Sequence, residues 1–588
     1  MSTHNFSSRF QNLSDTQFSD TEIQFLNKGL KYCIQPKFTN KIEEILASES
    51  HNALFSNSNK HLYAKLKIIE LIKTIKPVKF SKNETDILNQ IKEKINNDNL
   101  TITKADKGNC TVILRTIDYK QKVNDFINTE NLTLLNKDPT KKFASDVKNI
   151  VKNSTFTSDE LGFPIQKNPS IPKLYGNVKI HKENKPVRPV VSYTNAPNYK
   201  LAKKLNEILR NYHFSANYTI KNSIDLIKKL EPQHIPPTAL LVSFDVKSMF
   251  SKIPPKECIP LISEFLVSKQ ISPLKSNEIV NLFKVCISQN YFTFDNKIYV
   301  QNEGLPMGSP ISPILADIFM NNIERNIFSS TESNRILFWY RYVDDVLACF
   351  NGDQEELNGF LNFINRIHPK IEFTMEIEVN NSINFLDLNI KRDGNKFEYS
   401  IHRKPTHTDI IIPSKSNHPK SHKFAAFYSM IHRSFSVPMS KANFDKEISI
   451  IKQIARNNGY DSKLIDKLVR KKEFKLAINQ IYPIRIKEEK PYISFPYVGK
   501  ISDKISNIIS KTRNCSISFE AFNSIGTNLI NSKEKSSFLS KNGIYKLNCP
   551  CCNAIYIGQT SRNFEIRFNE HLCAFRNKKP EKSNFAKY

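Results

Sequence analysis

The sequence predicts a multidomain protein of mixed α/β (α+β) class, and three observations lead to that prediction. The chain has 588 residues, more than one ordinary domain contains. Its apolar fraction of 39%, with 40 phenylalanines, can form several hydrophobic cores. Residues 236–405 alternate strand-like apolar runs with helical apolar spacing, whereas residues 1–95 and 406–485 show mainly helical spacing.

Within residues 236–405 we expect the strands and helices of a ferredoxin-like core. Residues 238–245 form a short apolar run that ends in Asp245. Residues 335–350 form two apolar runs interrupted by Tyr342-Val343-Asp344-Asp345, the pattern of a hairpin with aspartates at its tip. Between these segments, a Gly/Pro turn precedes a helix whose apolar residues share one face: Ile311, Ile314, Leu315, Ile318, Phe319 and Ile323.

The aspartates predict a site for divalent cations. Burying two like charges together costs several kcal/mol unless a cation pairs with them. Two metal ions about 3.5–4 Å apart are the usual device for phosphoryl transfer. If the strand ending in Asp245 lies beside the hairpin, Asp245 and Asp344 can bridge two Mg²⁺ ions. Taken singly, each pattern also fits an ordinary alternative, a solvated turn or a capping aspartate.

The turn before the helix contains two of the 14 glycines of the chain within residues 304–308. Glycine lets the backbone approach a ligand closely, because it has no Cβ atom. The segment Gly304-Leu-Pro-Met-Gly308 therefore indicates a ligand contact, and an ordinary Gly/Pro helix start is the alternative.

Taken together and in this order, the three segments resemble motifs A, B and C of reverse transcriptases. The resemblance implies that Asp245 and Asp344 bind the metals and that Asp345 completes the catalytic triad, with the Val246 carbonyl as a further metal ligand. The implied cofactors are two Mg²⁺ (or Mn²⁺) ions.

The same resemblance implies a nucleotide site. Phe250 occupies the steric-gate position of the family, where a bulky ring excludes a 2′-hydroxyl group. Met307 and Gly308 stand where the family packs residues against the incoming nucleotide. Many retroviral enzymes carry glutamine at the Met307 position, so that contact differs here.

A narrower resemblance covers nearly the whole chain. Five further segments resemble Penelope-like retroelement reverse transcriptases, which are related to telomerase reverse transcriptases: residues 103–109, 174–182, 185–192, 384–389 and 402–409. This resemblance implies a right-hand polymerase. The expected regions are an N-terminal helical region (1–95), fingers (96–235), a palm (236–405), a helical thumb (406–485), a connector (486–540) and a partial endonuclease domain (541–588).

Four cations surround an expected turn in the fingers: Lys179, Lys182, Lys185 and Arg188. Cationic side chains at this spacing can converge on a triphosphate. We expect Lys179 and Arg188 to contact the nucleotide, with a solvated basic loop as the alternative.

The last 50 residues or so resemble the start of a GIY-YIG endonuclease, which many Penelope-like enzymes carry. The matching residues are Tyr545, Tyr556, Arg567 and His571. The metal-binding glutamate of that family lies on a later helix, beyond Tyr588, so we expect this chain alone not to cut DNA. In the same segment, Cys549 and Cys552 have the spacing of a zinc half-site. Zinc needs two further ligands, and the downstream histidines of the family are absent here. His571 or Cys573 could substitute, but His571 already belongs to the nuclease motif, so free thiols are expected in preference to zinc.

The net charge of +29 suits a polyanionic partner. The implied partners are an RNA template, a DNA primer, target DNA and dNTPs, and the family implies work in the nucleus. We expect no membrane span and no secretion signal. The expected function is RNA-directed DNA polymerisation. A domesticated nucleic-acid-binding protein with a silent site, a strand-cleaving nuclease and a template-independent transferase are the alternatives.

Overall fold

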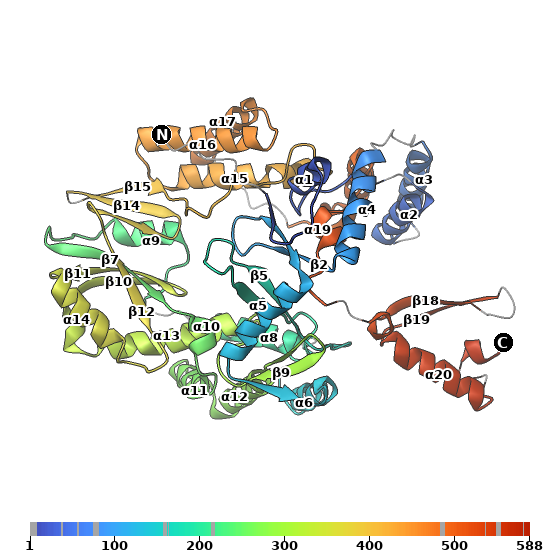
Figure 1. Cartoon of the computed structure of the whole chain (residues 1–588), viewed down its shortest axis with the longest axis horizontal. Helices are drawn as coiled ribbons and strands as arrows, with labels where there is room; N and C mark the ends of the chain where they lie inside the picture. Colours follow the sequence, from blue (N-terminus) through green and yellow to red (C-terminus); the bar gives the residue numbers. More distant parts are fainter. Residues whose placement is uncertain are drawn as a thin grey trace.

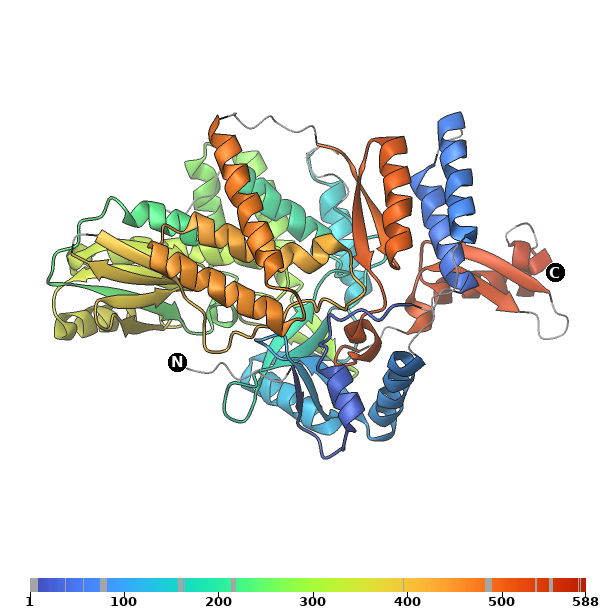
Figure 2. The ribbon, with the colours of Figure 1, turned by 90° about the horizontal axis from the view of Figure 1, so that it is seen from above.

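The structure is a computed structural model that describes residues 9–36, 39–55, 58–74, 82–156, 162, 164–212, 218–394, 396–481, 489–534, 537–548, 554–579, 581 and 583–587. Helices and strands form several packed units along the chain (Figures 1 and 2). In the described residues, no helix is long and apolar enough to cross a membrane.

Residues 236–405, the span expected as palm and called the palm below, contain an antiparallel sheet of four strands in the order β10-β11-β7-β12. The strands are β7 (Ala239–Val246), β10 (Ile336–Tyr342), β11 (Asp345–Asn351) and β12 (Phe373–Ile377). Helix α13 (Ser312–Phe328) precedes the β10–β11 hairpin, and α14 (Gln354–Ile364) follows it. This order is that of a ferredoxin-like split β-α-β core, so the expected fold class is confirmed.

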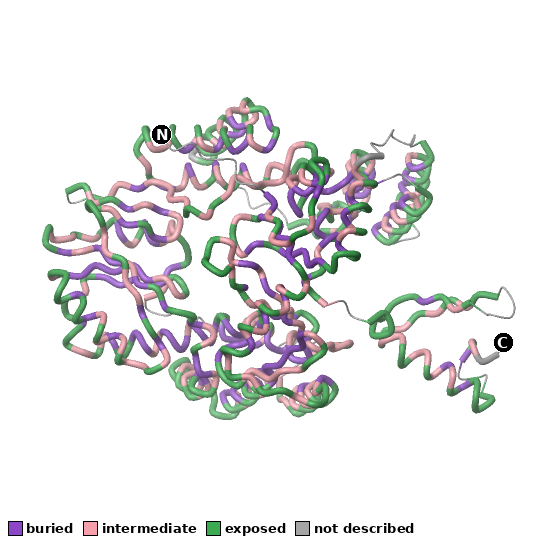
Figure 3. The backbone as a smooth tube through the Cα atoms, in the orientation of Figure 1, coloured by how far each residue is buried: buried purple, intermediate pink, exposed green. Residues whose placement is uncertain are grey.

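The two faces of this sheet differ because side chains alternate along a strand. Phe244, Val346 and Phe373 lie on one face and pack into the core that contains residues of α13 and α14. Leu241 and Leu347 lie on the other face, in a core with residues of β13 (Ser382–Phe385), β14 (Leu388–Asp393), β15 (Lys396–Ile401) and α9 (Ser223–Leu230). The purple segments of Figure 3 follow these buried strands.

The span expected as fingers, residues 96–235 and called the fingers below, contributes three strands to a five-stranded sheet in the order β4-β9-β8-β5-β6. Its strands are β4 (Leu132–Leu135), β5 (Lys173–Val178), β6 (Val187–Ser192), β8 (Tyr291–Phe294) and β9 (Lys297–Gln301). Two of them, β8 and β9, belong to the span expected as palm, so the sheet joins two separate stretches of chain. Helix α5 (Thr116–Thr129) shares a core with this sheet. The helices α6 (Thr140–Lys152), α8 (Tyr199–Asn211), α10 (Met249–Lys252), α11 (Cys258–Ser268) and α12 (Pro273–Ser288) contribute instead to the core that contains α13.

Three helices follow the palm: α15 (Lys420–Ser436), α16 (Lys441–Asn457) and α17 (Lys463–Ile481). Their apolar faces meet in one core around Phe427, Ile451 and Ile465. The turn between α16 and α17 needs glycine, because Gly459 has a φ of +76° and a Cβ there would lie 2.8 Å from Ser414 Oγ.

The N-terminal region packs against a distant part of the chain. Its elements are β1 (Phe10–Asn12), α1 (Asp20–Leu26), α2 (Asn40–Ala53), α3 (Asn59–Lys73) and α4 (Lys82–Asn97), and β1 joins β2 (Leu100–Lys104) and β3 (Thr111–Arg115) in one sheet. Strands β16 (Tyr492–Tyr497) and β17 (Ser516–Ala521) pair in parallel across α18 (Lys500–Arg513). This β-α-β unit shares a core with α2 and α3, and α19 (Ile525–Leu529) packs with residues of α1 and α4. The span expected as a connector therefore contains folded elements that complete the N-terminal cores.

The chain ends in a small module, drawn in red in Figure 1. It consists of the hairpin β18 (Gly543–Asn548) and β19 (Ile555–Thr560), followed by α20 (Phe564–Arg576) and the short helix η4 (Asn584–Lys587). Tyr545 and Tyr556 of the hairpin lie against His571 of α20.

Candidate active site

The palm sheet brings the three predicted aspartates to one end. Asp345 is the residue opposite Asp245 in the β11–β7 register, and Asp344 lies in the preceding turn. The Val246 N–H group donates a hydrogen bond of 3.2 Å to the Asp344 carbonyl oxygen, which ties the turn to β7. A strand and a hairpin 100 residues apart in sequence therefore build one carboxylate cluster.

The cluster carries more negative than positive charge. Burial and the neighbouring Asp344 raise the pKa of Asp345 to about 6. Burial and Asp344 also raise the pKa of Asp245. Glu376 adds to both shifts and Lys404 opposes them, and sequence reasoning assigned no role to either residue. Glu376 lies on β12 and Lys404 follows β15, so both act on the aspartates only because tertiary packing brings these segments near them.

The donor set fits a hard divalent cation, because carboxylate oxygens are the ligands that Mg²⁺ prefers. In the described residues, no three His, Cys, Asp or Glu side chains form a ready-made metal site. Mg²⁺ prefers an octahedral shell of oxygen atoms and usually keeps several waters, so a cation bound by these aspartates would also take oxygen ligands from water or from a phosphate group.

The turn that carries Asp344 has a strained backbone, and the buried Arg341 side chain stabilises it. Val343 has a φ of 58°, a conformation that costs a β-branched residue energy. The side chain of Arg341 is wholly buried, and its Nη1 donates to the Val343 carbonyl oxygen at 3.1 Å. Its Nε donates to Glu324 Oε1 at 2.7 Å, and Nη1 lies 3.3 Å from Asp317 Oδ1. Arg341 thus links the turn to α13.

Sequence reasoning did not single out Arg341. An arginine inside the apolar run of β10 was the available signal, because a charge there must find partners. Its partners lie on α13, where burial raises the pKa of Asp317 although Arg341 lowers it. Trp339 also donates from Nε1 to Glu324 Oε1 at 3.0 Å.

The Gly/Pro turn joins the palm to the fingers. A Cβ at Gly304 would lie 2.6 Å from the Ser251 carbonyl oxygen, and one at Gly308 would collide with the Val191 carbonyl oxygen of β6. The neighbouring Leu305 N–H donates to the Phe250 carbonyl oxygen at 2.7 Å. The turn therefore brings together the segment of Phe250 and strand β6, which also carries Arg188. Met307 is half-buried in this turn.

The β5–β6 hairpin confirms the expected turn between the fingers cations. Burial, followed by the charges of Lys182 and Arg188, lowers the pKa of Lys179. Arg188 is mostly exposed and pairs through Nε with Asp106 Oδ1 at 3.0 Å. The side chain of Asp106 is 3% exposed and its other oxygen has no hydrogen-bond partner. Asp106 lies in segment 103–109, which resembles the family, but its pairing with Arg188 was not predicted.

The C-terminal module brings its four predicted residues together. Tyr545 Oη lies 2.5 Å from Nε2 of the buried His571, and the ring centroids of Tyr556 and His571 are 5.3 Å apart. Arg567 hydrogen-bonds Tyr545 and also pairs with Glu570 at 3.1 Å. The possible zinc ligands Cys549 and Cys552 lie outside the described residues.

Comparisons with known proteins place these features in a family context. Residues 180–378 match the family model described as "Reverse transcriptase (RNA-dependent DNA polymerase)", and residues 410–470 match "Animal helix-turn-helix domain". The first match includes Arg188, Asp245, Gly308 and Asp344. The chain therefore carries a reverse transcriptase domain, and its enzyme class is that of an RNA-directed DNA polymerase.

Solved polymerase structures are similar to the chain at low sequence identity. A telomerase from Candida albicans in complex with a fragment of telomeric RNA has 10% identity and a TM-score of 0.47, over 84% of this chain and 81% of that one. An apo telomerase from Candida tropicalis has 11% identity and a TM-score of 0.39, over 87% and 88%. The Sicinivirus 3Dpol RNA-dependent RNA polymerase has 12% identity and a TM-score of 0.36, over 55% and 71%. The comparison with curated proteins gave no significant match.

Proposed function

We propose that this reverse transcriptase copies RNA into DNA by two-metal nucleotidyl transfer, as the enzyme of a Penelope-like retroelement. The observation that carries the proposal is the pairing of Asp245 with Asp345 across β7 and β11, with Asp344 beside them. A cluster of like charges with raised pKa values is unfavourable without a cation and is suited to binding one.

The residues of the chain would act as follows. Asp245 and Asp344, with the Val246 carbonyl, would hold the metals. Two Mg²⁺ (or Mn²⁺) ions, when bound, supply activation of the primer 3′-hydroxyl and neutralisation of the leaving pyrophosphate. Asp345 contributes negative charge that raises the affinity of the site for cations. Arg341 holds the Val343–Asp344 turn, and this turn would keep Asp344 beside Asp245 and Asp345 as successive nucleotides are added.

The nucleotide would lie between the Gly/Pro turn and β6. Lys179 and Arg188 belong to a group of cations that repel one another, and a triphosphate would relieve that repulsion. Asp106 pairs with Nε of Arg188, and the Arg188 side chain is mostly exposed, so its guanidinium could also meet a triphosphate. Phe250, half-buried at the start of α10, would contact the sugar and exclude a 2′-hydroxyl, while Met307 and Gly308 would line the base.

The other parts of the chain fit nucleic-acid partners. The helices α15, α16 and α17 would form a thumb that grips the template–primer duplex, and their similarity to a helix-turn-helix domain supports a DNA or RNA contact. We propose target DNA as a further partner and the nucleus as the place of work. The cluster of Tyr545, Tyr556, Arg567 and His571 supports a GIY-YIG-like module.

Primer extension tests the proposal. Purified protein with Mg²⁺ and dNTPs should extend oligo(dT) on poly(rA), and Asp344→Asn should abolish extension. Asp393→Asn, which changes an exposed aspartate at the end of β14, should leave it unchanged. A protein that binds the duplex and extends nothing would contradict the proposal and favour the nucleic-acid-binding alternative.

A further inference from the structure

Helix α3 carries apolar side chains on two separate faces. Ala64, Ile68 and Ile72 lie on the inner face, in a core with residues of α2 and α18. Leu62 and Leu66 lie on the outer face, and their exposed fractions are 54% and 59%. A surface helix needs one apolar stripe to pack on its own protein. The outer side chains therefore serve no core in the part of the chain that the structure describes.

Exposed apolar side chains gather in this region of the chain. Phe55, just after α2, is 81% exposed, and Tyr63 and Ile69 of α3 are 68% and 44% exposed. Together with Leu62 and Leu66, they place five large apolar side chains on the surface of one short segment. Figure 1 shows α2 and α3 (blue) at the edge of the molecule, and the exposed residues of α3 are green in Figure 3. Exposed apolar side chains that cluster in this way mark an interaction site.

The spacing of the outer side chains is that of a coiled-coil seam. Leu62, Leu66, Ile69 and Lys73 follow one another at intervals of four, three and four residues. The three apolar members of this series are called the outer stripe below. Such a/d spacing forms a narrow stripe, and a narrow stripe fits a second helix that packs lengthwise against it. The shape of the outer stripe therefore favours a helical partner.

Positive charge borders the outer stripe. Lys60, Lys65, Lys67 and Lys73 lie on α3, whereas Glu70 is the one acidic residue of this helix. Among the described residues, none of these four lysines forms an ion pair. A second copy of α3 would place lysines against lysines, and like charges across a helix interface are unfavourable. The charge pattern therefore favours an acidic partner.

We propose that α3 is a docking helix for another protein, and that this partner presents an amphipathic helix with acidic residues beside its apolar stripe. The outer stripe would pack against apolar a and d residues of the partner, as in a two-stranded coiled coil. Acidic side chains of the partner would pair with Lys65, which precedes Leu66, and with Lys73, which stands in the seam itself. This role goes beyond nucleotidyl transfer and does not depend on it.

Nucleic acid and membrane surfaces match the outer stripe less well. Phosphate groups of a nucleic acid would contact the lysines and leave the aliphatic side chains exposed to water. A membrane surface favours a helix with a large apolar face, wider than an a/d seam. Both surfaces are outcomes of the test below.

The test measures binding of two synthetic helical peptides to the full chain. Each peptide is about four heptads long, with leucine and isoleucine at a and d. The peptides differ only at e and g, which are glutamate in one and lysine in the other, and like charges keep each peptide from pairing with itself. Fluorescence anisotropy should show that the wild type binds the glutamate peptide about tenfold or more tightly than the lysine peptide.

Three variants assign the binding to α3. Leu62→Ser/Leu66→Ser should weaken binding of the glutamate peptide about tenfold or more. Lys65→Glu/Lys73→Glu should reverse the preference, so that the lysine peptide binds more tightly. Leu274→Ser changes a leucine of α12 that is 83% exposed and is the matched control, which should keep the wild-type affinities. None of these side chains is buried, so the midpoint of thermal unfolding should be the same in every variant.

Four results would overturn the proposal. Equal affinity for the two peptides, or an affinity that Leu62→Ser/Leu66→Ser leaves unchanged, would show that the outer stripe does not select an acidic helix. Self-association of the wild type that this double variant abolishes would assign the face to a second copy. Binding of phosphatidylserine vesicles or of oligo(rA), without peptide binding and lost in Lys65→Glu/Lys73→Glu, would assign the face to a membrane or to RNA. Peptide binding does not require catalysis, so a protein that extends no primer still gives these results.

Discussion

Replacing Arg341 should lower both the stability of the palm and the rate of nucleotide incorporation, and a second substitution should distinguish the two effects. Its side chain is 0% exposed and holds Glu324, Asp317 and the Val343 carbonyl oxygen. Arg341→Met leaves the buried carboxylate of Glu324 without its partner, which should lower the free energy of unfolding by about 3–5 kcal/mol. It also leaves the strained turn without its donor.

The catalytic loss can be derived from the single bond to Val343. A hydrogen bond from a charged donor contributes about 1.5–3 kcal/mol. If that energy positions Asp344 in the transition state, its loss lowers kcat about 10- to 150-fold, at 1.36 kcal/mol per tenfold. Single-nucleotide incorporation gives kcat, and denaturant unfolding gives the stability.

A double variant separates the two effects. Arg341→Met with Glu324→Gln removes both charges of the buried pair, and replacing both partners can be nearly neutral for stability. We expect this variant to recover most of the lost stability and to keep the low kcat, because the Val343 carbonyl still has no donor. Recovery of kcat together with stability would refute the positioning role.

Arg335 supplies the matched control. It pairs with Glu356 at 2.5 Å just before β10, but both side chains are largely exposed. Such surface pairs contribute about 1 kcal/mol or less. Arg335→Ala should therefore change neither unfolding nor kcat appreciably.

Three further predictions concern the proposed chemistry. Because the pKa of Asp345 is raised to about 6, lowering the pH from 8 through 6 should protonate this carboxylate and weaken the apparent Mg²⁺ affinity. The folded protein binds this proton more tightly than the unfolded chain, so the free energy of unfolding of the metal-free protein should rise as the pH falls. A pH-independent Mg²⁺ affinity would contradict this prediction. Phe250→Val should lower the preference for dNTPs over rNTPs by about tenfold or more, measured as the ratio of kcat/KM values, and an unchanged ratio would remove its role as a gate. Asp106→Asn should raise KM for dNTPs about 3- to 10-fold with a smaller change in kcat, since Arg188 loses its partner; an unchanged KM would show that Arg188 does not bind the triphosphate.

The three aspartates at the end of the palm sheet could be placed from the sequence because their signal is local. An apolar run ending in Asp245 and a hairpin tipped by Asp344 predict strands by side-chain type alone, and only the register remained to be found. The turn cations of the fingers were equally local, since Lys179 and Arg188 flank one hairpin.

Other features depended on segments far apart in the chain. Glu376 and Lys404 reach the aspartates only through the packing of β12 and of the segment after β15. The partners of Arg341 lie on α13, and those of Arg188 lie on the loop after β2. No periodicity in one segment reports such contacts.

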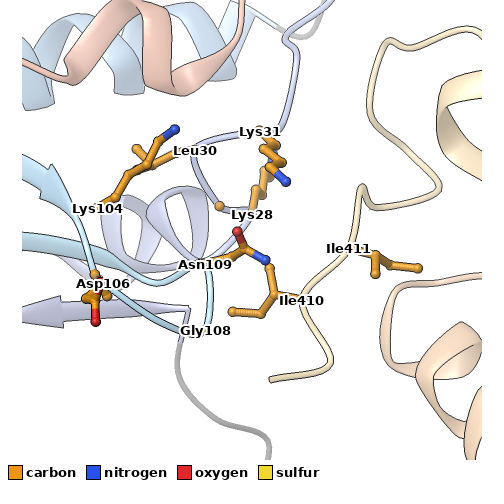
Figure 4. A pocket seen from close by; sticks show the side chains of 11 residues that line it. Lys28, Leu30, Lys31, Lys104, Asp106, Gly108, Asn109, Ile410 and Ile411 are labelled. Atoms are coloured by element: carbon orange, nitrogen blue, oxygen red, sulfur yellow. The ribbon is translucent and has the colours of Figure 1, made fainter. Parts of the chain in front are cut away.

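The sequence by itself determined the ferredoxin-like order of the palm and the helical character of residues 420–481, because alternation and turn residues act over a few positions. It also predicted which aspartates lie at the end of the palm sheet. The tertiary structure alone decided that β8 and β9 join the fingers sheet and that residues 492–529 complete the N-terminal cores. It also decided that Lys28, Lys31 and Lys104 line one cavity together with Ile410 and Ile411 (Figure 4). These outcomes depend on which apolar faces and charged side chains come into contact. Those contacts join segments far apart in the chain, so they form only when the whole chain folds.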